Sequence, residues 1–279
     1  MIPLAVVFAC IVLAVSAGLI ALRVSDKRAD CVEIERLLKT QPANPMAFHT
    51  DLIATLPEPA QRYFMFMIEE GTPLLPVVQL TMQGRFSLGS KENPNYMAMS
   101  AKQVLALPDG FVWGMSGGRG VMRISGSDSS RWTRFWLAGL VPVARAGGSW
   151  DHAASAYGRM VAEAVFWSPA SVLPRDGVTW EALDDHTARV TVTHLSHVQA
   201  VDVTIDNTGR PTKVALNRWS NANPDGLYRQ QSFGGYLSEF RIFEGYRIPT
   251  HVEGGYFIDT PAFHPFFIAD VTKATFLTH

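Results

Sequence analysis

The sequence has very little cysteine and almost no net charge. Cys10 lies inside an apolar run and Cys31 lies shortly after it, so the remaining residues have no thiol for a disulfide framework or a CxxC site. Lysine and arginine together number 24 against 25 acidic residues. Without a basic excess there is no long-range field to attract a polyanion, and we expect no nucleic-acid partner.

Familiar motifs for metal ions and nucleophiles are also missing. There is no HExxH, and Gly117-Gly-Arg-Gly120 lacks the Lys-Ser/Thr ending of a phosphate-binding loop. His194 and His197 are three residues apart, and on a strand residues at that spacing point to opposite faces, so we expect that they do not share an ion. Gly114-Met-Ser-Gly-Gly118 fits GxSxG, but the pattern predicts a second strand afterwards, where a nucleophile elbow needs a helix. We therefore expect neither a metal nor a cofactor.

The chain does contain one long uncharged run, residues 2–22. As a helix rising about 1.5 Å per residue it would extend about 31 Å, near the hydrocarbon thickness of a bilayer. No lysine or arginine precedes it, whereas a signal peptide starts with a basic region. We interpret the run as a single-pass anchor in the lipid bilayer. A signal peptide cleaved near residues 14–18 and a buried core helix remain the alternatives.

Basic residues follow the run at Arg23, Lys27 and Arg28. Because lysine and arginine stay preferentially on the cytoplasmic side, they favour a cytoplasmic body, with an extracytoplasmic body as the alternative. We divide the chain into an anchor at 1–23, a helical linker at 24–54 and a single β-rich domain at 55–279.

The β-rich domain alternates apolar and polar residues with a period of two from Val77 onward, which is typical of half-buried strands. Helices are predicted near 57–70 and 150–173. Closely spaced strands with one helical interruption predict an α+β fold: a large curved, mostly antiparallel sheet, possibly a half-open barrel, with a few packed helices. The strands are expected at 77–88, 96–107, 110–116, 119–125, 131–140, 178–183, 188–195, 198–206, 211–219, 231–243, 246–258 and 265–277.

Arg159 and Glu163 are four residues apart in the second helical segment and should share one helix face. One interpretation is an ion pair that holds the helix against the sheet. The other makes Glu163 a buried general acid or base whose pKa is set by Arg159. No second catalytic group is visible at a related spacing, which favours the structural interpretation.

Large aromatic side chains are abundant, with seven tryptophans and sixteen phenylalanines. They could simply fill a thick core between sheet and helices. Alternatively, they could line an apolar cavity for a lipid-like ligand. On the second interpretation, the candidate ligand-binding residues are Trp113, Trp132, Trp136, Trp167 and Trp180.

A series of short motifs resembles a bacterial family of unknown function whose members often carry an amino-terminal membrane helix. The resemblance covers roughly residues 50–276 and implies a strand-rich body similar to the half-open barrels of bacterial lipoprotein carriers; it implies no established activity. Its motifs, in chain order, are Leu56-Pro-Glu-Pro-Ala-Gln-Arg-Tyr63, Gly110-Phe-Val-Trp113, Gly139-Leu-Val-Pro-Val143, Gly158-Arg-Met-Val-Ala-Glu163, Trp167-Ser-Pro169, Trp180-Glu-Ala-Leu-Asp184 and Gly245-Tyr-Arg-Ile-Pro249.

Three functions remain open from the sequence. The first is a membrane-tethered, non-enzymatic binding protein for a lipid-like or other hydrophobic molecule. The second is a membrane-associated interaction or assembly factor, for which an exposed apolar patch is expected. The third is an enzyme that uses Glu163 as an acid or base. The sequence leaves the oligomeric state open.

Overall fold

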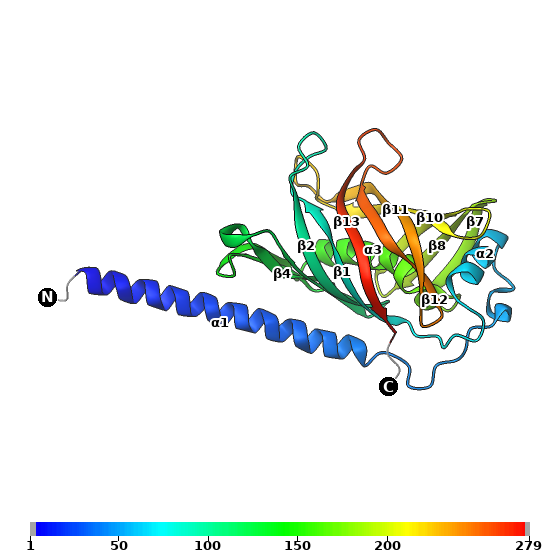
Figure 1. Ribbon diagram of the computed structural model, residues 1–279, viewed down its shortest axis with the longest axis horizontal. Helices are drawn as coiled ribbons and strands as arrows, with labels where there is room; N and C mark the ends of the chain where they lie inside the picture. The colour runs from blue at the N-terminus through cyan, green and yellow to red at the C-terminus, as the bar shows by residue number, and fades with distance from the viewer. Residues whose placement is uncertain (1–3, 277–279) are drawn as a thin grey trace.

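The protein folds as an α+β structure around one antiparallel sheet of 13 strands (Figure 1). The computed structural model describes residues 4–276. The spatial order is β6-β5-β4-β3-β2-β1-β13-β12-β11-β10-β9-β8-β7, so every strand except β1 and β13 pairs only with chain neighbours. The sheet curves around a central helix, α3, as Figure 1 shows. The predicted fold class is confirmed.

The elements follow one another in a simple order, with the helices gathered at the start and in the middle of the chain. The helical elements are α1 (Leu4–Leu38), η1 (Thr50–Ile53), α2 (Glu58–Met67), η2 (Gly120–Met122), α3 (Trp150–Trp167) and η3 (Pro169–Val172). The strands are β1 (Val77–Ser87), β2 (Tyr96–Ala106), β3 (Gly110–Gly117), β4 (Ile124–Ser129), β5 (Trp132–Leu137), β6 (Val141–Gly147), β7 (Val178–Asp184), β8 (Thr187–His194), β9 (His197–Ile205), β10 (Pro211–Ser220), β11 (Arg229–Phe243), β12 (Tyr246–Tyr256) and β13 (His264–Thr275).

Helix α1 contains residues 4–23 of the predicted anchor and the first half of the predicted linker, and the first three anchor residues lie outside the described part of the chain. It runs from Leu4 to Leu38 without a break at residue 23. It is the one helix among residues 4–276 that is long and apolar enough to cross a membrane, and its most apolar stretch is not buried in the body. The buried core helix that the sequence left as an alternative is therefore wrong.

The C-terminal half of α1 packs on the outer face of the sheet. Leu37 is fully buried with Val77, Val104 and Val112 of strands β1 to β3. Asp26 of α1 also meets the outer face of the sheet, where it pairs with Arg134 of β5 and Arg145 of β6. The linker after residue 23 is thus part of a helix held against the body.

The strand predictions fail locally between β3 and β6. Of the predicted strand 119–125, residues 119–123 are not extended, because Gly118 and Gly120 adopt positive φ angles of 75° and 55° and the chain makes a 3-10 turn before β4 begins at Ile124. Only glycine enters that region at low cost. The predicted strand 131–140 is also too long.

Strand β6 was not predicted at all. Ala138 and Gly139 have φ angles of 50° and 75° and reverse the chain after β5, and Val141–Gly147 then pairs back on β5. The period-two pattern in β6 is weak because most of its residues are exposed at the sheet edge. An edge strand buries little, so its sequence carries little alternation.

The argument against a metal site at His194 and His197 was wrong in its geometry. The two histidines end β8 and begin β9, and they are directly paired across the hairpin. Directly opposite residues in an antiparallel pair project to the same face. Within residues 4–276, no group of three histidine, cysteine or acidic side chains is placed to hold a metal ion.

Helix α3 lies across the inner face of the sheet and makes most of its contacts with β9 and β10. Ser149 caps its first turn by accepting a hydrogen bond from the His152 backbone N–H. Gly158 permits close packing, since a Cβ there would lie 2.7 Å from Oε1 of Gln199. This close approach brings α3 against β9 and β10.

Candidate functional site: a cavity under helix α3

A cavity of about 530 Å³ lies between α3 and the inner face of the sheet. Its wall is built by β1 to β6 on one side and by β10 to β13 on the other, with α3 between them. Most of the lining is aliphatic or aromatic. The aromatic lining residues are Phe86, Trp113, Phe135, Phe166, Trp167, Phe233, Phe266 and Phe267.

The register of four neighbouring strands places one row of residues beneath α3. Gln103 of β2 pairs with Trp113 of β3, Trp113 pairs with Asp128 of β4, and Asp128 pairs with Thr133 of β5. Directly opposite residues share a face, so all four project toward the helix. We call these four residues the cross-strand row.

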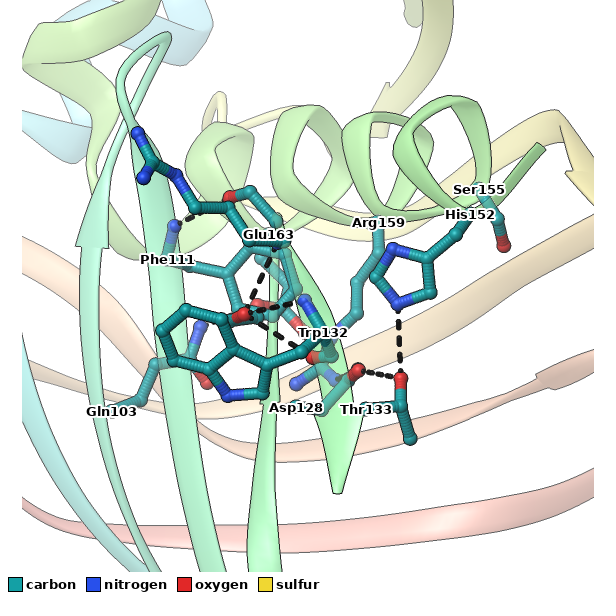
Figure 2. A network of polar contacts seen from close by, with 12 residues as sticks. Gln103, Phe111, Asp128, Trp132, Thr133, His152, Ser155, Arg159 and Glu163 are labelled. Carbon is teal, nitrogen blue, oxygen red and sulfur yellow. Dashed lines mark hydrogen bonds and ion pairs between the residues drawn. The ribbon is translucent and has the colours of Figure 1, made fainter. Parts of the chain in front are cut away.

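Arg159 of α3 joins the helix to this row (Figure 2). Its Nη1 donates to Oδ2 of Asp128 at 2.7 Å, and its Nε donates to Oε1 of Glu163 at 2.7 Å. The guanidinium also lies over the rings of Phe111 and Trp113, at 4.9 Å and 5.1 Å from their centroids. A cation that loses water in this way is stabilised by two carboxylates and by ring faces together.

Arg159 remains charged despite its burial. Burial lowers the pKa of Arg159, but the neighbouring Glu163 and Asp128 carboxylates outweigh it and hold the pKa above its ordinary value. Removing the cation would leave two carboxylates without their main partner in a poorly hydrated place. Arg159 thus links α3 to β4 through Asp128 while it pairs with Glu163 of its own helix.

Glu163 is occupied on both oxygens. Oε1 accepts from Arg159, and Oε2 accepts a short hydrogen bond from Nε2 of Gln103. A general base must lie within hydrogen-bond reach of a substrate proton, whereas both oxygens of Glu163 are already directed at protein donors. The contacts of Glu163 favour the structural interpretation of the Arg159–Glu163 pair.

The network continues from Asp128 to His152. The hydroxyl of Thr133 donates to Oδ1 of Asp128, and Nε2 of His152 lies 3.1 Å from the same hydroxyl (Figure 2). Because the Thr133 proton is directed at Asp128, the arrangement is satisfied when Nε2 of His152 carries a proton and donates. Burial lowers the pKa of His152.

Two polar atoms of the cross-strand row have no partner in the described chain. Within residues 4–276, the indole Nε1 of Trp113 and Oε1 of Gln103 are buried and make no hydrogen bond. A buried donor or acceptor without a partner costs about 1–3 kcal/mol. Of the two residues, Trp113 lines the cavity and Gln103 does not.

The structure separates the five candidate tryptophans into two groups. Trp113 and Trp167 line the cavity. Trp132 and Trp136 lie on the outer face, where their indole N–H groups donate to Ser127 and to Asp26 of α1. Trp180 packs against Tyr63 and Phe64 of α2, away from the cavity. The last three are therefore not proposed as ligand contacts.

Sequence reasoning missed Asp128, Gln103 and the phenylalanines of the cavity wall. Asp128 stands in a Gly-Ser-Asp-Ser-Ser stretch that looks like a turn, and Gln103 lies in an ordinary strand. Only the pairing register brings them together, since they are 25 positions apart in the chain but one strand apart from Trp113. The GFVW and GRxxxE motifs were the one available signal, because they supply Trp113, Arg159 and Glu163.

The chain belongs to the family of unknown function DUF6544, whose model matches residues 46–268. This confirms the family resemblance seen in the sequence. No curated protein matches the chain.

Two solved structures are similar in fold. A LolA superfamily protein from Nitrosomonas europaea aligns with a TM-score of 0.40 and 10% identity over 79% of this chain and 93% of that one. A domain from Vibrio parahaemolyticus named for outer membrane lipoprotein sorting aligns with a TM-score of 0.35 and 12% identity, over 72% of this chain and 86% of that one.

Proposed function

We propose that this protein is a membrane-tethered, non-enzymatic binding protein for a hydrophobic molecule that carries one uncharged polar group. The observation that carries the proposal is the cavity under α3. Its volume of about 530 Å³ falls within the roughly 300–1,000 Å³ typical of small-molecule sites. Its aromatic and aliphatic wall matches the lining of such sites.

The charged residues of the wall support an uncharged ligand. The charged lining residues are Asp128, Glu163, Arg159 and Arg218, and their charges sum to zero. Arg159 pairs with both carboxylates, whereas Arg218 donates to the carbonyl oxygen of Ser155. A fully charged group would enter a largely apolar cavity at a high desolvation cost. The unpartnered N–H of Trp113, which lines the cavity, instead suits an uncharged oxygen such as that of a hydroxyl or amide, which can accept from it.

The tether follows from α1. Its residues from Leu4 to Leu22 are exposed over most of their surface, which is unfavourable in water and favourable in lipid. For the side of the membrane we keep the proposal drawn from Arg23, Lys27 and Arg28, which places the body in the cytoplasm. A single-pass protein with a ligand cavity would hold its cargo near the bilayer.

Native mass spectrometry of the full chain, extracted in a mild detergent, tests the binding proposal. Ala162 lines the cavity and is buried. We expect a bound molecule of lipid-like mass on the unaltered protein and its loss in Ala162→Phe, because the new ring occupies the cavity. Ala144→Phe fills the same cavity from β6, so a folding failure of one variant leaves the other to test the proposal.

The control is Ala182→Phe in β7, which is exposed and outside the cavity. Lipid that merely coats α1 should persist in all three variants. The proposal is wrong if the unaltered protein is consistently empty, or if the adduct survives both cavity-filling substitutions in folded protein.

The native mass spectrum also tests whether α1 is retained as a tether. A labelling reaction tests on which side of the membrane the body lies. An intact mass that includes residues 1–22 excludes a cleaved signal peptide. Cys31 is exposed and lies beyond the apolar run. In a Cys10→Ser background we expect a membrane-impermeant maleimide to label it only after the cells are permeabilised. Labelling in intact cells would place the body outside the cytoplasm.

A further inference from the structure

The sheet carries exposed apolar side chains at two turns, one between β3 and β4 and one between β5 and β6. Val121 and Met122, between β3 and β4, are 79% and 65% exposed, and Leu140 and Val141, between β5 and β6, are 42% and 50% exposed. We call these four residues the apolar rim. Figure 1 shows the β4 region extending along α1 toward its N-terminus, beyond the rest of the sheet.

Contacts with Arg23 fix the position of the apolar rim along α1. Nη2 of Arg23 donates to Oγ of Ser125 at 3.0 Å. A Cβ at Gly139, in the turn before Leu140, would lie 3.5 Å from Cζ of Arg23. Arg23 follows Leu22 directly, so the rim lies where α1 leaves its uncharged run.

The surroundings of the rim are basic. Between Gly110 and Trp150 the sequence has five arginines, of which three pair with acids of α1: Arg131 with Glu33, and Arg134 and Arg145 with Asp26. Arg119 and Arg123 flank the η2 turn and are exposed. Apolar tips flanked by arginines match the interface of a bilayer with anionic headgroups.

The rim is continuous with the cavity wall. Ile124 follows the η2 turn and Val143 follows Leu140 and Val141, and both side chains line the cavity. Phe135 and Ala144 extend the same wall inward. An apolar path thus connects the level of the α1 lipid segment with the space under α3.

We propose that the apolar rim inserts into the interface of the bilayer that holds α1, and that the cavity exchanges its ligand laterally with that bilayer. The inference rests on the proposed function, because it needs α1 in the membrane and a ligand in the cavity. We infer lipid as the occupant because the rim lies beside the end of the uncharged run of α1 and because Arg119 and Arg123 flank its η2 turn.

Site-directed spin labels on the full chain test this, in nanodiscs of phosphatidylcholine and phosphatidylglycerol and in a Cys10→Ser/Cys31→Ser background. The reporters are Val121→Cys and Leu140→Cys. We expect relaxation by oxygen to exceed relaxation by a water-soluble nickel chelate at both, as in lipid. The matched control is Leu195→Cys at the β8–β9 turn, an exposed apolar side chain near the far edge of the sheet, where the nickel chelate should dominate.

A label at Leu13→Cys distinguishes a failure of the rim insertion from a failure of the membrane tether. If Leu13 reports lipid while both rim labels report water, the inference is overturned and the tether stands. If Leu13 itself reports water, the tether fails and the inference fails with it. Dipolar coupling between identical rim labels would show a second copy as the occupant and would also overturn the inference.

Discussion

The guanidinium of Arg145 in β6 donates to both carboxylate oxygens of Asp26 in α1, at 2.7 and 3.0 Å, across 119 residues of sequence. The indole N–H of Trp136 donates to the same carboxylate at 3.0 Å. Burial raises the pKa of Asp26, but the hydrogen bonds from Arg145 and Trp136 outweigh it and leave the pKa below its ordinary value. The ion pair holds the proposed anchor helix in a fixed direction relative to the sheet.

We expect Asp26→Ala to loosen α1 from the body. The change leaves the indole N–H of Trp136 and the Arg145 guanidinium without their shared acceptor, so the free energy of unfolding should fall by about 2 kcal/mol. Chemical denaturation of the full chain in detergent measures it, and trypsin should cut faster after Lys27 and Arg28. The control is Asp225→Ala, which removes an exposed pair with Arg229 and should change stability by less than about 0.5 kcal/mol. Equal effects in both variants would contradict the docking role.

Arg159→Met should lower the free energy of unfolding far more than Glu163→Gln. The first leaves Asp128 and Glu163 as uncompensated carboxylates, at a cost of roughly 3–5 kcal/mol. The second removes one charge but keeps the side-chain shape, at a cost of about 1–2 kcal/mol. Denaturation of both variants measures the difference. The native mass spectrum of Glu163→Gln should still show the bound molecule, and an abolished function in stably folded Glu163→Gln would instead support an acid or base role.

Trp113→Phe should cost less stability than Trp167→Phe. Within residues 4–276 the indole N–H of Trp113 is unpaired, whereas that of Trp167 donates to the carbonyl oxygen of Pro249 at 3.3 Å. Replacing Trp113 therefore removes an unsatisfied donor together with some packing, and we expect the two losses of unfolding free energy to differ by about 1 kcal/mol.

Trp113→Phe also tests whether the ligand contacts the indole N–H, with Ala182→Phe as the control. If the ligand accepts from the Trp113 N–H, competition native mass spectrometry should show weaker retention of the bound molecule by Trp113→Phe than by Ala182→Phe. Equal retention would show that the ligand makes no hydrogen bond with that indole.

His152 should make the protein less stable at mildly acidic pH. Burial lowers the pKa of His152, with Asp128 raising it and Arg218 lowering it further. The unfolded chain therefore binds this proton first, and stability falls as the pH drops below the ordinary histidine value of about 6.5. Above that pH the histidine is neutral in both states and contributes no pH dependence.

Melting temperatures between about pH 7.5 and pH 5 measure this effect. We expect His152→Gln to reduce the loss of stability on acidification, because glutamine cannot take up the proton. His186→Gln is the control, since His186 lies exposed at the β7–β8 turn. An unchanged slope in His152→Gln would show that other groups carry the acid sensitivity.

Local patterns predicted the elements well where they were long and half-buried. The period-two alternation of Val78, Leu80 and Met82 identified β1, and the apolar stripe after Ser149 identified α3. The prediction failed where burial is weak or glycine reverses the chain, as at β6 and the η2 turn. Local periodicity reports burial, so an exposed edge strand leaves little trace of itself.

The sequence by itself therefore determined the uncharged helix, the antiparallel α+β class and the Arg159–Glu163 spacing, because each depends on residues close together in the chain. Only the tertiary structure decided that Trp113 faces the cavity while Trp132 and Trp136 face α1. It also decided that Arg159 meets Asp128, 31 residues earlier. Both results depend on strand register, and a shift of one residue exchanges the two faces of a sheet.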